Sequence, residues 1–259
     1  GLAYARDREQ FGKAIINFPA VYDMLALMKA KLDAGRALLY QCSRYVDIYK
    51  ALDDIARERK LEADERKEQK KYAKLADSLT PLAKGMNSEY CNQNTYDSLQ
   101  IHGGSGFMME YPIQRYYRDA RITSIYEGTT QLQVVAAIRY VTNGSYLAQM
   151  REFETADVAD EFRPLQERAK AMADKFEEAT NRVKEAADAA YHDLCARHLV
   201  EMAGDVIMLH LLLHNATANA ELFGKSARVY ANFVEAEVAK HHTFVMNLRP
   251  EDVADYVQA

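Results

Sequence analysis

The sequence predicts an all-α protein made of two helical bundles, on two observations. Glycine and proline, which interrupt helices, are sparse, with 11 and 5 residues among 259. Apolar residues recur at spacings of three and four, and strict alternation is nearly absent, which is the pattern of helices with one buried face. Hydrophobic residues make up 49% of the chain, enough for a sizeable core. We expect a first helical domain at residues 1–148 and an accessory bundle at residues 149–259.

The first long helix is expected to begin at Asn17-Phe18-Pro19 and to run to about Lys50. Proline suits the first turn of a helix, because its missing N–H would have no partner there. Six apolar residues share one face of this segment and predict its buried side. They are Val21, Met24, Leu25, Met28, Leu32 and Leu39.

The segment 51–71 is strongly charged, with roughly two thirds of its residues Asp, Glu, Lys or Arg in mixed order. This composition is typical of a solvated surface, so we expect a charged insertion that serves as a connector. A second long helix is expected from Tyr72 through Pro81, which favours a kink, to Gly103-Gly104-Ser105-Gly106. The glycines let the backbone leave the helix in a left-handed turn.

Two further helices complete the first domain, from Ile113 to Arg118 and from Thr129 to about Val141. Between Thr142 and Asp160 the apolar pattern weakens, and Asn143-Gly144-Ser145 is a typical stop signal. We therefore place the domain boundary there.

The second half is expected to form three long helices, about Phe162 to Ala187, Ala189 to His214 and Thr217 to Leu248. Arg249-Pro250 ends the last of them, and a short tail helix is expected to follow. An apolar stripe spaced by three and four residues predicts that the middle helix packs inside a bundle. The stripe consists of Leu199, Met202, Val206, Leu209 and Leu213.

Composition argues against several classes of function. The net charge of -5 is small and both signs are interspersed, so nucleic acid is not an expected partner. Cys42, Cys91 and Cys195 are odd in number and widely spaced, which indicates a reducing compartment and no disulfide framework. The apolar run 206–213 is far shorter than the roughly 18 residues that a membrane span needs. A start at Gly1 in place of Met indicates a cut in a longer protein.

The histidines are not expected to bind metal. His192, Cys195 and His198 lie three residues apart and fan around a helix, so they do not converge on one ion. His241-His242 point apart and are expected at the surface.

One stretch of about thirty residues carries the candidate chemistry. It combines a glycine turn, a short basic helix and a lone carboxylate before a helix start. Acidic residues and threonines favour helix N-termini, where they cap free N–H groups, so a purely structural role for Glu127 is open at this point. The segments are Gln100-Ile101-His102-Gly103-Gly104-Ser105-Gly106-Phe107, Arg118-Asp119-Ala120-Arg121 and Tyr126-Glu127-Gly128-Thr129-Thr130.

These segments resemble the acyl-CoA dehydrogenase family, whose C-terminal domain carries Q-I-x-G-G-x-G-F, then R-D-A and Y-E-G-T. Arg8-Glu9-Gln10-Phe11-Gly12-Lys13 is similar to the family's R-x-Q-F-G-K segment. The resemblance covers residues 1 to about 144, and residues after 150 resemble a helical extension in a longer-chained branch. His102 stands at the variable position of the Q-I-x-G-G segment, and it is expected to shape the glycine turn and to take no part in catalysis. Pro19 stands where the family commonly has Gln, and it cannot donate a hydrogen bond.

The resemblance implies an oxidoreductase of fatty acid β-oxidation that converts an acyl-CoA thioester into the trans-2-enoyl-CoA. Glu127 matches the family's base, which removes the α proton, and Glu127 and Gly128 match substrate contacts. FAD is the implied cofactor. Thr129, Thr130 and Gln131 match contacts to the flavin of the same subunit.

A second set of residues matches family positions that reach the FAD of a partner subunit, which implies a homodimer or homotetramer. An electron-transfer flavoprotein is the implied electron acceptor, and the location is the bacterial cytoplasm or the mitochondrial matrix. The partner-facing set is Arg8, Gln10, Phe11, Gln100, Gly103 and Gly104.

Two alternatives stay open. An acyl-CoA oxidase would use the same base and flavin but pass electrons to oxygen. A non-catalytic helical interaction module would use these motifs only for packing and capping. The family's other domains supply much of the pocket, so we expect this chain alone to bind FAD weakly and to lack turnover.

Overall fold

A computed structural model describes residues 1–254, and it confirms the predicted all-α fold. The only strands within that range are two strands of two residues each, which form a hairpin with Glu9 opposite Ala14. Its turn places Phe11 and Gly12 at φ 51° and 78°, as a tight hairpin requires. The elements are α1 Leu2–Asp7, β1 Glu9–Gln10, β2 Lys13–Ala14, η1 Ile15–Asn17, α2 Pro19–Glu58, α3 Ala63–His102, α4 Gly104–Phe107, α5 Ile113–Thr123, α6 Thr130–Thr142, α7 Ser145–Glu154, η2 Asp160–Phe162, α8 Arg163–Ala186, α9 Ala189–Ala218, α10 Ala220–Asn247 and α11 Glu251–Ala254.

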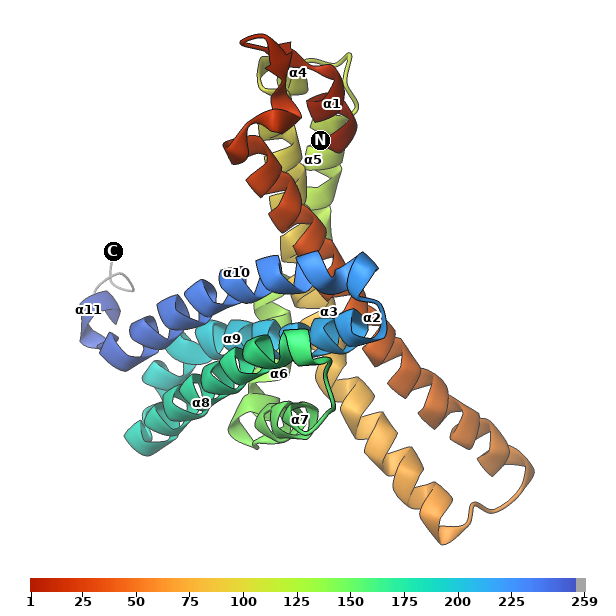
Figure 1. The fold of residues 1–259 in the computed structure, drawn as a ribbon. Coiled ribbons are helices and arrows are strands. Elements are labelled where there is room, and N and C mark those ends of the chain that lie inside the picture. The colour runs from red at the N-terminus through yellow and green to blue at the C-terminus, as the bar shows by residue number, and fades with distance from the viewer. Residues whose placement is uncertain (255–259) are drawn as a thin grey trace.

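The two longest helices, α2 and α3, run antiparallel and support the other elements. Figure 1 shows α2 and α3 side by side along the whole length of the molecule, from the N-terminal tip to the end of a projecting hairpin. Helix α5 lies along α3 near the tip, and α8, α9 and α10 pack together across the middle of the pair. The predicted second bundle therefore lies against the first domain.

The charged segment 51–71 is the far end of this helical hairpin. The expected helix limits at Lys50 and Tyr72 are wrong, because α2 continues to Glu58 and α3 begins at Ala63. Glu62 and Glu65 form a capping box that starts α3. The expected charged surface is present, with exposed ion pairs such as Arg59 with Glu65 at 2.6 Å. Charge in this stretch marks a solvated helix surface and does not interrupt the helices.

Local capping sets the other helix limits. Asn219 accepts a hydrogen bond from the Leu222 N–H at 3.0 Å, so α10 begins at Ala220 and not at Thr217. Gly144, at φ 78°, ends α6, and α7 follows it in a region where no helix was expected. The boundary proposed after residue 148 lies inside α7 and stays a prediction.

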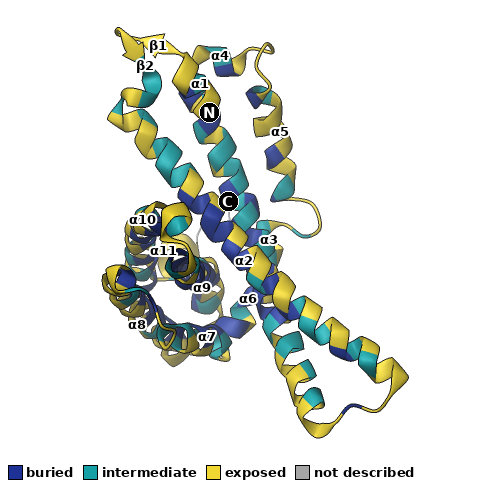
Figure 2. Ribbon diagram, turned by 45° about the vertical axis from the view of Figure 1, so that its right-hand side comes forward, coloured by how far each residue is buried: buried dark blue, intermediate teal, exposed yellow. Residues whose placement is uncertain are grey.

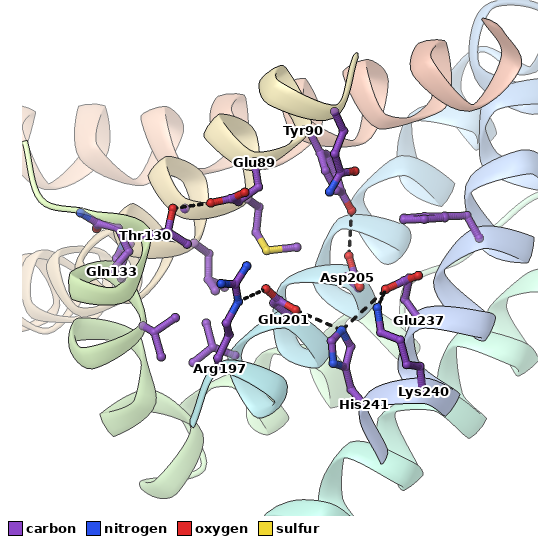
Figure 3. Close-up of a pocket in the computed structure, with 18 residues that line it drawn as sticks. Glu89, Tyr90, Thr130, Gln133, Arg197, Glu201, Asp205, Glu237, Lys240 and His241 are labelled. Carbon is purple, nitrogen blue, oxygen red and sulfur yellow. Dashed lines mark hydrogen bonds and ion pairs between the residues drawn. The ribbon is translucent and has the colours of Figure 1, made fainter. Parts of the chain in front are cut away.

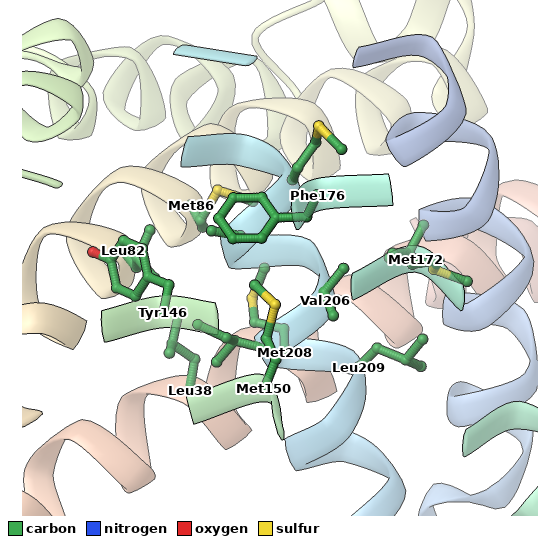
Figure 4. Packing of buried hydrophobic residues seen from close by; sticks show 14 of the residues in the cluster. Leu38, Leu82, Met86, Tyr146, Met150, Met172, Phe176, Val206, Met208 and Leu209 are labelled. Carbon is green, nitrogen blue, oxygen red and sulfur yellow. The ribbon is translucent and has the colours of Figure 1, made fainter. Parts of the chain in front are cut away.

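Helix α9 is the centre of the core. Figure 4 shows Val206, Met208 and Leu209 packed against residues of both halves, including Leu38 and Met150. In Figure 2 the buried residues gather here, while the projecting hairpin is largely exposed. By length and composition α9 could cross a membrane, but 83% of its apolar stretch is buried within the protein. Its apolar character is explained by its place in the bundle.

Candidate active site

Glu127 lies in a tight loop between α5 and α6. Its φ is 52° and that of Gly128 is 93°, so two successive residues adopt the left-handed region. The side chain of Glu127 is exposed and accepts no hydrogen bond from residues 1–254. Thr129 is the residue that caps α6, because its Oγ1 accepts from the Leu132 N–H at 3.3 Å. The capping role considered for Glu127 therefore belongs to Thr129.

Side chains from two helices hold this loop. Lys84 of α3 donates to the Gly128 carbonyl at 2.6 Å, and Gln133 of α6 donates to the same oxygen at 3.3 Å. Thr130 donates through Oγ1 to Glu89 of α3 at 2.5 Å. Gly128 has φ 93°, a backbone conformation that favours glycine, and a Cβ there would lie 2.8 Å from the Gln133 amide nitrogen, so the Gln133 side chain would have to shift. Gln131 is exposed on the first turn of α6.

The N-terminal motif and the glycine turn meet at the other end of α3. Arg8, Gln10, Gly103 and Gly104 line one surface pocket of about 390 Å³, although more than ninety residues separate the two motifs. An added Cβ at either glycine would meet nothing within 4 Å, so the backbone there is open to a ligand. Gly103 has φ 58° and ends α3.

The remaining partner-facing candidates do not line that pocket. Phe11 is 88% exposed at the hairpin turn, and Gln100 is exposed on the last turn of α3. His102 stacks on Tyr4 with ring centroids 4.2 Å apart, and its Nδ1 lies 2.7 Å from the Ser98 carbonyl oxygen. The contacts of His102 are those of a residue that shapes the turn.

The two groups of candidates lie far apart. Glu89 contacts Thr130 in the middle of α3, whereas Gly103 ends the same helix 14 residues later. At about 1.5 Å per residue the separation is roughly 20 Å. One chain therefore carries two separate patches, one around Glu127 and one around Arg8.

A third feature was not expected from the sequence. A cavity of about 210 Å³ lies between α3, α6, α9 and α10, and it is lined by charged side chains (Figure 3). Tyr90 donates to Asp205 at 2.8 Å, and burial raises the pKa of Asp205 to about 7. Burial acts in the same direction on Glu201, but hydrogen bonds from His241 and Arg197 outweigh it and hold that pKa at about 2.

The expectation that His241 lies at the surface is wrong, because this side chain is only 4% exposed. Its Nε2 lies 3.1 Å from Glu201, which compensates for the loss of water. The polar series Arg197, Glu201 and Asp205, spaced by four in an apolar helix, is the sequence signal that could have revealed this network. Among residues 1–254 no group of three His, Cys, Asp or Glu side chains has the geometry to hold a metal ion.

Family models match almost the whole chain. Residues 2–140 match the model "Acyl-CoA dehydrogenase, C-terminal domain", and residues 142–253 match "Acyl-CoA dehydrogenase C terminal". The helical fold and the motif-bearing loop thus fall in a known class of flavoenzyme domains. This chain belongs to the acyl-CoA dehydrogenase family.

Curated relatives match about half of the chain. A caffeyl-CoA reductase–Etf complex subunit, CarC, of Acetobacterium woodii is 36% identical over 132 residues, 51% of this chain and 28% of CarC. A probable acyl-CoA dehydrogenase, fadE25, of Mycobacterium bovis is 34% identical over 138 residues, 53% of this chain and 30% of that protein. The matches thus span less than a third of these relatives.

Solved structures share the fold of almost the whole chain. An acyl-CoA dehydrogenase of Bacillus anthracis complexed with FAD aligns with a TM-score of 0.71 at 22% identity, over 94% of this chain and 44% of that one. ACDH-11 of Caenorhabditis elegans, in complex with C11-CoA, aligns with a TM-score of 0.70 at 19% identity, over 96% and 40%. At these identities the likeness concerns the fold alone.

Proposed function

We propose that this chain is the C-terminal, flavin-facing part of an FAD-dependent acyl-CoA dehydrogenase, with Glu127 as the catalytic base. The observation that carries the proposal is the free, exposed carboxylate of Glu127 on a loop fixed to α3 and α6. A base must reach the substrate proton directly, and a carboxylate engaged in a helix cap could not. Family membership supports this role.

The residues around Arg8 fit a flavin dinucleotide. Arg8 offers a guanidinium whose one hydrogen bond among residues 1–254 is a long one to Gln10 at 3.4 Å. Gly103 and Gly104 leave open space beside it, where a diphosphate could approach the backbone. When bound, FAD would supply the acceptor for the hydride that leaves the substrate β carbon. Arg8, Gln10, Gly103 and Gly104 would hold it in one subunit, and Thr129, Thr130 and Gln131 in the other.

The chain's own part in the reaction is proton removal. Glu127 takes the α proton of the thioester, and its backbone N–H donates to the thioester oxygen, where enolate charge develops. Substrate that covers the loop excludes water from the carboxylate, which favours its protonated form and therefore proton transfer to it.

The partners follow from this role. We propose an acyl-CoA substrate, a homodimer or homotetramer, and an electron-transfer flavoprotein as electron acceptor, in the bacterial cytoplasm or the mitochondrial matrix. The C. elegans neighbour binds C11-CoA, which supports the acyl-CoA substrate. The CarC relative belongs to a complex with Etf, which supports the electron-transfer flavoprotein. The isolated chain is expected to bind FAD weakly and to have no turnover.

Glu127→Gln in the full-length protein tests the assignment. The amide keeps the shape of the side chain but cannot take a proton, so we expect kcat to fall by at least about a thousandfold with FAD still bound. Activity is measured by dye reduction with a series of acyl-CoA thioesters. Glu185→Gln, an exposed change on α8, serves as the control. Full activity in Glu127→Gln would exclude Glu127 as the base; the base would then lie on a helix outside this chain, or the motifs would serve only packing and capping.

The oxidase alternative is tested in the same preparation. Acyl-CoA oxidase3 of Yarrowia lipolytica shares the fold with a TM-score of 0.70 at 16% identity, so the fold is compatible with both activities. Release of hydrogen peroxide at the rate of substrate turnover would identify an oxidase.

A further inference from the structure

Two side chains of α3 attach the loop that carries Glu127. Lys84 donates to the carbonyl of Gly128 at 2.6 Å, and Glu89 accepts from the hydroxyl of Thr130 at 2.5 Å. These bonds fix the loop at the first and third residues after Glu127. A donor and an acceptor little more than one turn apart thus set the path of the chain that leaves Glu127.

The loop needs this attachment because its backbone is unfavourable. Glu127 adopts φ 52° although it is not a glycine, and Gly128 follows it at φ 93°. Left-handed conformations of residues other than glycine persist only where the surroundings fix them. Without its bonds to α3 the loop would relax, and the direction of the carboxylate would change.

The same turns of α3 are fixed on their other side by the accessory bundle. Met86 packs against Gly204 of α9 so closely that a Cβ there would lie 3.0 Å from the Met86 Cγ. Tyr90 donates to Asp205 of α9 at 2.8 Å. Figure 3 shows Glu89 and Thr130 on one side of the cavity and Tyr90 with Asp205 on the other.

We propose that Lys84 and Glu89 are positioning residues for Glu127, and that the accessory bundle holds the turns of α3 that carry them. This inference rests on the proposed role of Glu127 as base. Neither side chain touches substrate in this scheme. Their loss misdirects the carboxylate, so it lowers the rate of proton removal more than it weakens substrate binding.

The test compares Lys84→Met, which keeps the length of the side chain but removes the donor, with Lys84→Arg, which keeps a donor. In the full-length protein we expect kcat of Lys84→Met to fall about tenfold to a hundredfold, with KM within about threefold and FAD content unchanged. Lys84→Arg restores most of the rate. Lys70→Met, an exposed lysine of the same helix, leaves it unchanged. In the 259-residue chain, amide hydrogen exchange of residues 124–130 becomes faster in Lys84→Met.

An unchanged kcat in Lys84→Met, or a loss of rate in step with lost FAD, would overturn the inference. If Lys84→Met does not fold, Glu89→Leu and Glu89→Gln provide the same comparison, because only glutamine keeps an acceptor for Thr130. The proposed function fails separately, if Glu127→Gln stays active. Loss of activity in Glu127→Gln with full activity in the Lys84 and Glu89 variants would refute the positioning role alone.

Discussion

Asp205 shows how the packing of helices sets the chemistry of one residue. Its carboxyl group is 3% exposed, accepts a hydrogen bond from Tyr90 at 2.8 Å and lies 3.4 Å from the hydroxyl of Tyr230. No ion pair forms to this group among residues 1–254. The neutral acid is therefore favoured in the folded state, and its pKa rises to about 7 from an ordinary value of 3.8.

Asp205 should make stability depend on pH. Because the folded-state pKa is raised, the contribution is fully present below about pH 4 and is lost as the pH rises through about 7. Asp205→Asn keeps an acceptor for Tyr90 but cannot ionise. We expect its free energy of unfolding, relative to wild type, to gain roughly 1 kcal/mol per pH unit across that range. Denaturant titrations at several pH values measure the difference.

The matched control is Asp157→Asn, an exposed aspartate with no contact of this kind. Its stability should follow the wild type at every pH. Parallel curves for wild type and Asp205→Asn would show that folding does not raise the pKa of Asp205.

Single residues were predictable from the sequence only where a local motif contains them. Glu127 and Gly103 stand in short, distinctive segments, and the structure places them in a left-handed loop and at a helix end. Asp205 and His241 carry no local motif. Their environment depends on α3, α9 and α10 meeting. The spacing of Arg197, Glu201 and Asp205 marks a polar stripe on α9, but it does not say which helices cover that stripe.

At the scale of elements, the short helix α4 contains two glycines with different roles. Gly106 is packed closely against α3, and Gly104 faces open space. A Cβ at Gly106 would lie 2.7 Å from the backbone oxygen of Leu99 and 2.8 Å from the Cβ of His102. Around Gly104 the same atom would meet nothing within 4 Å. The first glycine is required by packing, and the second leaves space at the surface.

Alanine at Gly106 should therefore lower stability, whereas alanine at Gly104 should affect ligand binding and leave stability nearly unchanged. Gly106→Ala is expected to lower the free energy of unfolding by about 1–3 kcal/mol, because neither contact atom can rotate away. Gly104→Ala should leave stability within about 0.5 kcal/mol of wild type. In the full-length protein it should weaken FAD binding about tenfold, because its Cβ fills the open space beside Arg8. Chemical denaturation and flavin titration measure the two effects, and equal stability of both variants would contradict the packing argument.

A capping residue did not by itself make a helix limit predictable, because the starts of α3 and α10 were missed although Glu62 and Asn219 cap them. The start of α9 was found, and Asp188 caps it by accepting from the Tyr191 N–H at 2.9 Å. Helix α7 was missed, because its ten residues carry little apolar signal and depend on buried Tyr146 and Met150. The end of α2 and the start of α3 were missed because the high density of charged residues between 51 and 71 is also typical of a connector.

At the scale of the whole molecule, the two predicted bundles share one core. Leu38 of α2, Leu82 of α3 and Tyr146 of α7 belong to the same buried cluster as Val206 of α9. Apolar periodicity predicts which face of each helix is buried, but it does not say against which partner. Most of the helices were therefore predictable from the sequence, but the packing of the two bundles into one core was not.

The roughly 20 Å between the Glu127 and Arg8 patches has a genetic consequence. If each catalytic centre takes Glu127 from one subunit and Arg8 from its neighbour, two inactive alleles can complement each other. Coexpressed Arg8→Ala and Glu127→Gln chains form mixed dimers in which one centre lacks both residues and the other keeps both. With random pairing, about a quarter of wild-type activity returns. If both residues served a centre within one chain, coexpression would restore nothing.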